Sequence, residues 1–98
     1  MIFQVKLTAS AADMFARLHP EIRKNIKTGL NGLTENPYLG KPLQNELALF
    51  RSLKLKRFRV VYRIDEVNTR VVVYAIGHRK DIYEVILWKL QQSGRQGE

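Results

Sequence analysis

The sequence of 98 residues contains no cysteine and only two histidines, and this scarcity excludes several kinds of chemistry. Without cysteine the chain has no disulfide, no thiolate nucleophile and no cysteine ligand for a metal. The two histidines, His19 and His78, lack a third ligand at suitable spacing, so we predict no metal site and no cofactor.

Long hydrophobic runs are also missing. No apolar stretch approaches the roughly 20 residues that are needed to span a bilayer. The N-terminus lacks the basic region and apolar core that are typical of a signal peptide. We therefore expect a cytoplasmic protein without a membrane partner.

Acidic residues are few: nine Asp and Glu accompany 17 Lys and Arg, which gives a formal net charge of +8. Such an excess favours association with RNA, DNA, acidic proteins or anionic membranes. The apolar content of 45% is ordinary for a globular protein, and the length suits one domain. We predict a single domain over residues 1–90, followed by a frayed tail over residues 91–98.

The hydrophobic pattern predicts a strand, two helices, three strands and a closing helix. Strands are expected at 2–7, 51–56, 57–65 and 69–77, and helices from Ser10 as N-cap, over 20–34, and from Asp81 onward. Asp13 would then favour the positive end of the first helix. This order is typical of an α+β sandwich with the helices on one face, which leaves the opposite face concave and basic.

Cations alternate with apolar residues in two of these strands. Because successive side chains of a strand point to opposite faces, Ser52, Lys54 and Lys56 should share one face. Arg59 and Arg63 should share a face opposite the core side chains of their strand. The pattern indicates a surface that binds a polyanion, with His78 at its rim as a group that moves protons near neutral pH.

Together with these strand patterns, the sequence resembles the RelE/ParE superfamily of bacterial and archaeal type II toxins over nearly the whole chain. The run LKLKRFRVVYRI at 53–64 carries most of the resemblance, and YAIGHRKDIY at 74–83 and GKPL at 40–43 support it. The resemblance implies the RelE-like microbial RNase fold. RelE-like members are ribosome-dependent endoribonucleases that cut mRNA in the A site, whereas ParE-like relatives poison DNA gyrase.

The resemblance also implies roles for residues. Lys54 and Arg59 match cations that contact the scissile region, and Arg79 matches the arginine after the last strand. His78 and Tyr83 are the candidates for proton transfer. The cations expected to bind RNA are Lys54, Lys56, Arg57, Arg59, Arg63 and Lys80.

Other interpretations of these residues stay open. A basic strand face is often only solvated, His78 is compatible with an ordinary surface histidine, and Tyr83 with packing of the last helix on the sheet. Ser52 replaces a lysine that some nucleases of the family carry. Trp88 is either a half-exposed packing residue or part of an antitoxin-binding surface.

Three functions therefore compete: an mRNA-cleaving toxin that inhibits translation, a gyrase-inhibiting toxin of the ParE type, and a member that binds its antitoxin without cleaving. The implied partners are a cognate antitoxin, mRNA with the 30S A site of the ribosome, and operator DNA through the antitoxin complex.

Overall fold

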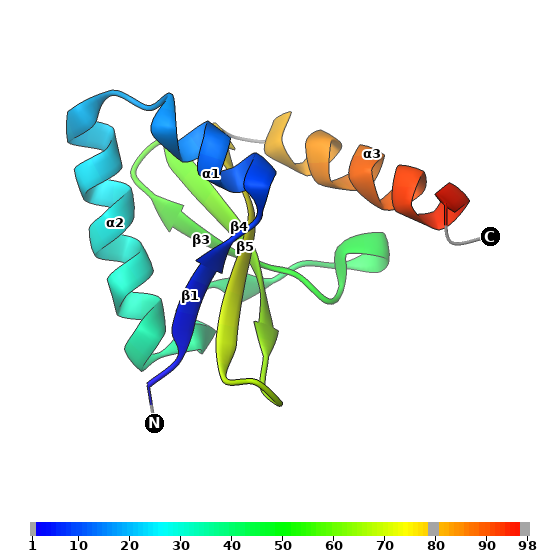
Figure 1. Ribbon diagram of the computed structural model, residues 1–98, viewed down its shortest axis with the longest axis horizontal. Coiled ribbons are helices and arrows are strands. Elements are labelled where there is room, and N and C mark those ends of the chain that lie inside the picture. The colour runs from blue at the N-terminus through cyan, green and yellow to red at the C-terminus, as the bar shows by residue number, and fades with distance from the viewer. Residues whose placement is uncertain (1, 79–80, 97–98) are drawn as a thin grey trace.

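The computed structural model describes residues 2–78 and 81–96, and its elements follow the order expected from the sequence (Figure 1). In chain order they are β1 (Gln4–Leu7), α1 (Ala9–Ala16), α2 (Pro20–Glu35), the 3₁₀ turn η1 (Pro37–Leu39), β2 (Lys41–Pro42), the 3₁₀ turn η2 (Asn45–Leu47), β3 (Arg51–Leu55), β4 (Phe58–Asp65), β5 (Arg70–His78) and α3 (Asp81–Gln96). The α+β class is confirmed. The structure adds β2, a two-residue strand in a stretch that the sequence predicts as a loop.

The strands form one five-stranded sheet in the order β1-β5-β4-β3-β2. The strands β3, β4 and β5 make the predicted antiparallel meander, and β1 pairs in parallel with β5. The helical pair α1 and α2 connects β1 to the rest of the sheet. At the other edge, β2 pairs with the start of β3.

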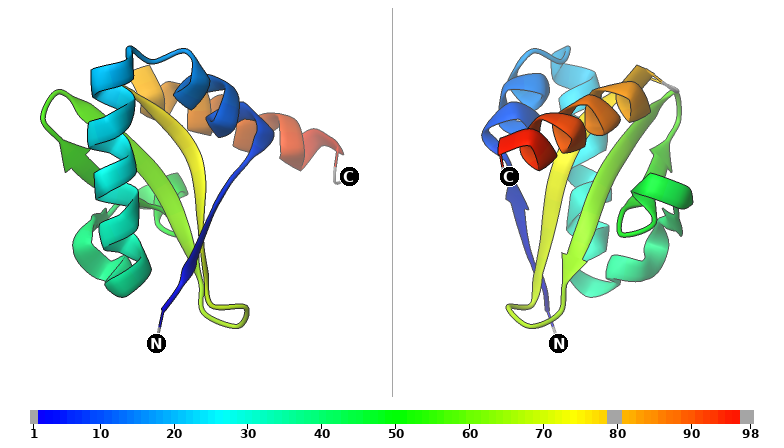
Figure 2. Two further views of the ribbon diagram at one scale, coloured as in Figure 1. Left: turned by 60° about the vertical axis from the view of Figure 1, so that its left-hand side comes forward. Right: turned by 90° about the vertical axis from the view of Figure 1, so that its right-hand side faces the viewer.

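Helices cover both faces of the sheet, so the prediction that all of them lie on one face is wrong. The helices α1 and α2 pack on one face, where Ile26 and Leu33 meet Val60 and Val71. The helix α3 lies on the opposite face (Figure 2). There Ile82 and Ile86 pack with Val61 and Ala75, because β4 and β5 carry apolar side chains on both of their faces.

The start of α1 also differs from the prediction. Thr8, rather than Ser10, caps this helix, since its Oγ1 accepts a hydrogen bond of 3.1 Å from the Ala11 N–H. Ser10 lies inside the helix. Asp13 consequently falls outside the first turn, and its carboxylate instead pairs with Arg17 at 3.2 Å.

A β-bulge interrupts the pairing of β4 with β5. Val61 faces Ala75 and the next residue, Tyr62, faces Val73, so that Tyr74 has no partner across the ladder. An extra residue of this kind reverses the alternation of side chains beyond it. Val73 belongs to the core beneath α1 and α2, whereas Tyr74 and Ala75 both pack on the side of α3.

The loop between α2 and β3 is held against the sheet by the buried side chain of Tyr62. Its hydroxyl accepts a hydrogen bond of 2.9 Å from the Gly40 N–H and donates one of 2.7 Å to the Pro37 carbonyl oxygen. Arg51 donates to the Gly40 carbonyl oxygen at 2.7 Å. Burial raises the pKa of Tyr62 above the ordinary value, and the Gly40 N–H lowers it by a smaller amount.

Candidate nucleic-acid interface

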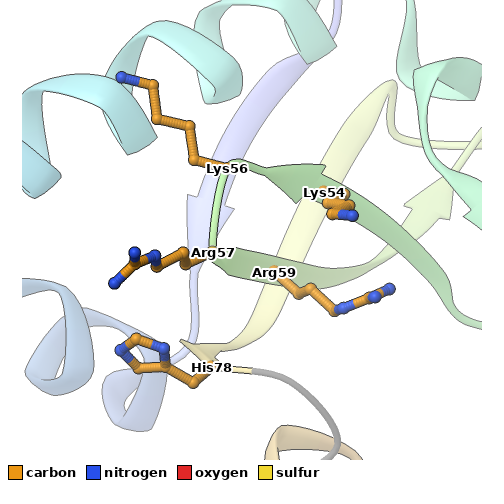
Figure 3. Close-up of a pocket in the computed structure, with 5 residues that line it drawn as sticks. All are labelled: Lys54, Lys56, Arg57, Arg59 and His78. Carbon is orange, nitrogen blue, oxygen red and sulfur yellow. The ribbon is translucent and has the colours of Figure 1, made fainter.

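Cationic side chains gather where β3 turns into β4, at the end of the sheet. Lys54 and Arg59 are direct partners across the two strands, and Lys56 and Arg57 form the turn that joins them. The last residue of β5, His78, lies beside this turn because it pairs with Phe58. A hollow of about 560 Å³ is lined by Lys54, Lys56, Arg57, Arg59 and His78 (Figure 3).

A second hollow, of about 750 Å³, begins on the other side of the same two cations. Lys54 and Arg59 line both hollows and therefore form the ridge between them. The loop held by Tyr62 supplies much of the second wall. The lining residues are Leu39, Lys41, Pro42, Leu43, Gln44, Ser52, Leu53, Lys54, Arg59 and Tyr83.

Tyr83 of α3 reaches into the strand surface at this ridge. Its hydroxyl lies 3.0 Å from Ser52 Oγ and accepts a hydrogen bond of 3.3 Å from Arg59 Nη1. Ser52 is only 8% exposed, whereas Lys54 is exposed to solvent. The structure thus brings Tyr83, Arg59 and Ser52 together on the face of the sheet that α3 covers. The sequence singles out all three.

The imidazole of His78 lies on the other side of the sheet. It rests on the ring of Phe58, with 4.1 Å between the ring centroids and 44° between the planes. Phe58 itself packs against the core beneath α1 and α2. Figure 3 shows His78 and Arg57 pointing toward that side, while Arg59 points the opposite way. The structure therefore separates His78 from the Tyr83 hydroxyl, although both line the region of the cations.

The remaining predicted residues are placed differently. Arg63 lies on the same face as Arg59 but lines neither hollow, and its guanidinium sits over the Phe50 ring at 5.7 Å from the centroid. Arg79 and Lys80 lie outside the described residues. Trp88 is 59% exposed on α3, so it contributes little to the core.

Sequence reasoning missed the wall of the second hollow. The motif Gly40-Lys41-Pro42-Leu43 could have indicated this wall, but the sequence pattern does not specify what the motif does. Gly40 sits so close to β3 that an added Cβ would lie 2.6 Å from Tyr62 Oη and 2.8 Å from the Ser52 carbonyl oxygen. Glycine is therefore required for the loop to approach the strand that carries Ser52 and Lys54.

The part of the chain that the structure describes offers neither a metal site nor a membrane span. No group of three or more His, Asp or Glu side chains there is arranged to hold a metal ion. No helix within residues 2–78 and 81–96 has the length and apolar character to cross a membrane.

Comparison with known proteins identifies the family. A family model described as the ParE toxin of the type II toxin–antitoxin system parDE matches residues 5–83. The chain belongs to the RelE/ParE superfamily of type II toxins. Toxin RelG of Mycobacterium tuberculosis is 35% identical over 85 residues, which are 85% of this chain and 98% of RelG. Toxin RelE of the same organism is 36% identical over 85 residues, 85% of this chain and 88% of that toxin.

Solved structures agree with this assignment. The RelBE2 toxin–antitoxin complex of M. tuberculosis contains a chain that matches with a TM-score of 0.75 and 32% identity, covering 81% of this chain and all of that one. A mutant of E. coli toxin RelE in the free state shares the fold, with a TM-score of 0.73 at 20% identity over 86% of this chain and 93% of that one. The chain is a type II toxin with the α+β RelE-like fold.

Proposed function

We propose that this toxin is an endoribonuclease that cuts mRNA in the ribosomal A site and thereby inhibits translation. The observation that carries the proposal is the contact of the Tyr83 hydroxyl with Arg59, directly across the ladder from Lys54. Two relatives above 30% identity that are named RelE and RelG support it.

The reaction has simple requirements. The 2′-oxygen of the RNA attacks the adjacent phosphorus, a phosphorane forms, and the bond to the 5′-oxygen breaks. One group must take the 2′ proton, another must return a proton to the 5′-oxygen, and cations must offset the charge of the phosphorane. Attack by the 2′-hydroxyl requires no metal and no cofactor.

The geometry suits a division of these roles. Arg59 and Lys54 would offset the phosphorane charge, since preformed donors aimed at developing charge are often the largest contribution to catalysis. Tyr83 would transfer a proton, and its contact with Ser52 Oγ would orient its hydroxyl. Arg79 keeps the role that the family resemblance implies, as a further cation at the phosphate. Lys56, Arg57 and Lys80 would bind the RNA backbone.

A cognate antitoxin is the protein partner that we propose. Solved relatives include a RelBE2 toxin–antitoxin complex and an E. coli RelE mutant bound to a peptide of antitoxin RelBc. An acidic and apolar segment would cover the two hollows of this toxin and pair with Lys54 and Arg59. Through that complex the toxin would also be held at operator DNA.

Inhibition of DNA gyrase is the second candidate function, because the matching family model describes a ParE toxin. A supercoiling assay with purified gyrase distinguishes the two. Inhibition by the toxin, together with intact message in a translation assay, would replace our proposal with this one. A folded toxin inactive in both assays would be a member that only binds its antitoxin.

Cleavage of message in a purified translation system is the test of the proposal. Wild type, Arg59→Ala and Arg63→Ala are compared with and without ribosomes, and cuts are mapped by primer extension. We expect cuts only with ribosomes, and a loss of about 10²–10³-fold in rate for Arg59→Ala. Arg63→Ala is the matched control, since it removes the same charge from the same face of β4 without lining either hollow.

The pair of variants makes the outcome specific. Wild-type activity in both Arg59→Ala and Arg63→Ala would contradict the assignment of the site. Equal losses of activity in the two variants would indicate that overall charge matters rather than Arg59. Circular dichroism of each variant establishes that its fold is intact.

A further inference from the structure

His78 and Phe58 form a pair of aromatic rings where β5 ends and β4 begins. It stands at the end of β4 and β5, on the side of α1 and α2, and thus on the opposite side of the sheet from the Tyr83 hydroxyl. The imidazole is exposed and borders the hollow of about 560 Å³, while Phe58 supports it from the core side. An exposed imidazole, backed by a phenyl ring inclined to it at 44°, therefore lies at the rim of a cationic hollow.

A proton-transfer group needs a partner that orients it and a place beside the reacting atoms. The His78 imidazole packs against the ring of Phe58, which supplies no hydrogen bond, and within residues 2–78 and 81–96 no hydrogen bond or ion pair orients it. The tyrosine and arginine of the proposed reaction site face the other way. His78 therefore meets neither requirement.

We propose that His78, supported by Phe58, is a stacking platform for a base of the RNA and does not transfer protons. Bases stack on aromatic side chains wherever a cationic groove follows the backbone of a single strand, and the stacking tolerates any sequence. Lys56 and Arg57, in the turn from β3 to β4, line the same hollow as the platform and as the ridge of Lys54 and Arg59. They would hold the phosphates that connect the stacked base to the scissile bond.

The platform extends the RNA path around the end of the sheet. A strand whose scissile phosphate sits at Arg59 would pass the turn of Lys56 and Arg57 and place a neighbouring base on His78. The inference rests on the proposed function, because it requires that single-stranded RNA binds at the cations. An antitoxin segment is the other occupant with suitable chemistry, and the experiment below includes it.

The test measures binding of the full-length toxin to a single-stranded oligoribonucleotide by fluorescence anisotropy. Methylation of every 2′-hydroxyl of the oligonucleotide prevents cleavage and keeps the ribose, and a second oligonucleotide has the same backbone with abasic positions. Wild type, His78→Ala and His78→Phe are compared. Phe58→Leu tests the support, because it keeps apolar volume in the core and removes the ring.

We expect His78→Ala to weaken binding of the normal oligonucleotide about tenfold, and His78→Phe to bind within about twofold of wild type. Wild type should prefer the normal oligonucleotide over the abasic one, and His78→Ala should largely lose this preference. In ribosome-dependent cleavage, His78→Ala should raise KM and leave kcat nearly unchanged, with His78→Phe restoring KM.

Three results would overturn the inference. If His78→Ala and His78→Phe both lost kcat with unchanged affinity, the histidine would transfer protons. If His78→Ala weakened only the complex with the antitoxin, the platform would belong to the protein partner. If wild type bound no RNA and cut no message, both the platform and the proposed endoribonuclease function would fail. The first two results, by contrast, would overturn only the platform.

Discussion

Lys56, which lines the cationic hollow, has a strained backbone conformation. Its φ is 58°, in the left-handed region that costs an ordinary residue roughly 1–2 kcal/mol relative to the right-handed one. Glycine would relieve this strain at the two-residue turn between β3 and β4, yet the sequence has a lysine there. Because the lysine works against the local backbone preference, we expect its charge to have a function at the turn.

The substitution Lys56→Gly should separate stability from function. We expect it to raise the free energy of unfolding by up to about 1 kcal/mol, because the strain disappears while the unfolded chain gains some entropy. It should also weaken RNA binding, since it removes a phosphate contact. Denaturant unfolding and anisotropy measure the two effects. In Lys56→Ala, the matched control, the charge is lost and the strain remains, so binding should fall without a gain in stability.

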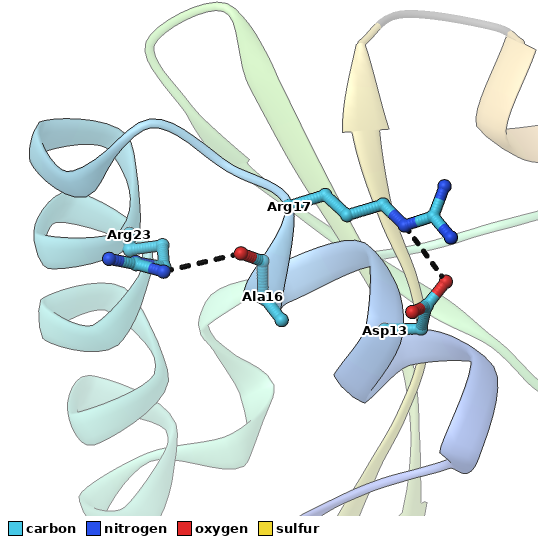
Figure 4. Close-up of polar contacts among 4 residues, drawn as sticks. All are labelled: Asp13, Ala16, Arg17 and Arg23. Atoms are coloured by element: carbon cyan, nitrogen blue, oxygen red, sulfur yellow. Dashed lines mark hydrogen bonds and ion pairs between the residues drawn. The ribbon is translucent and has the colours of Figure 1, made fainter.

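At the scale of elements, the α1–α2 pair supplies no cation to the lining of the two hollows, and the loop behind it supplies Lys41. Arg23 donates to the Ala16 carbonyl oxygen at 3.2 Å across the turn between the helices, next to the exposed pair of Asp13 and Arg17 (Figure 4). Exposed ion pairs of this kind contribute little stability. The loop that follows is held more firmly, because Tyr62 buries two hydrogen bonds to its backbone.

Removing the Tyr62 hydroxyl should loosen this loop. We expect Tyr62→Phe to lower the free energy of unfolding by about 1–3 kcal/mol, because the Gly40 N–H and the Pro37 carbonyl lose their buried partner. Tyr38→Phe removes a hydroxyl from an exposed tyrosine and should cost less than about 0.5 kcal/mol. Urea unfolding at neutral pH measures both, and equal effects would contradict the role of Tyr62.

The raised pKa of Tyr62 makes the stability of the wild type depend on pH. The folded state keeps its proton at a pH where the unfolded state, with a pKa near 10.0, has lost it. The stabilisation by this tyrosine is therefore complete below about pH 10 and is lost as the pH rises through the folded-state pKa. Wild type should lose stability across this range, and Tyr62→Phe should lose less.

The whole molecule carries a formal net charge of +8, and four of its cations line one hollow at the end of the sheet. Binding of single-stranded nucleic acid releases counterions, so the logarithm of the binding constant falls with the logarithm of salt concentration. The slope reports how many phosphates are neutralised. It therefore distinguishes cations that contact RNA from cations that only raise the net charge.

Arg57→Ala and Arg70→Ala should differ in this measurement. Arg57 lines the hollow beside His78, whereas Arg70 begins β5 at the end of the strand far from it. We expect Arg57→Ala to reduce the magnitude of the slope by about 0.7, and Arg70→Ala to leave it nearly unchanged. Anisotropy titrations at several salt concentrations give the slopes. Equal slopes for the two variants would mean that RNA does not lie along this hollow.

Much of this architecture follows from local pattern. The alternation of Lys54 with Leu53 and Leu55, and of Arg59 with Phe58 and Val60, placed these cations and core residues on their correct faces. The order of elements and the basic hairpin were predictable for the same reason, since periodicity is local. The apolar stripe of the last helix was predicted as far as Leu90, and the helix itself continues to Gln96.

Long-range contacts decided the rest. Tyr83 meets Ser52 and Arg59 only because α3 packs through Ile82 and Ile86 on the face that a one-sided arrangement would have left open. The face of His78 depends on the bulge at Tyr74. Strict alternation from Val73 would put His78 on the side of Arg59, and the one extra residue moves it to the side of Phe58. A pattern of residue types specifies which side chains alternate, whereas strand register and helix docking specify which of them meet.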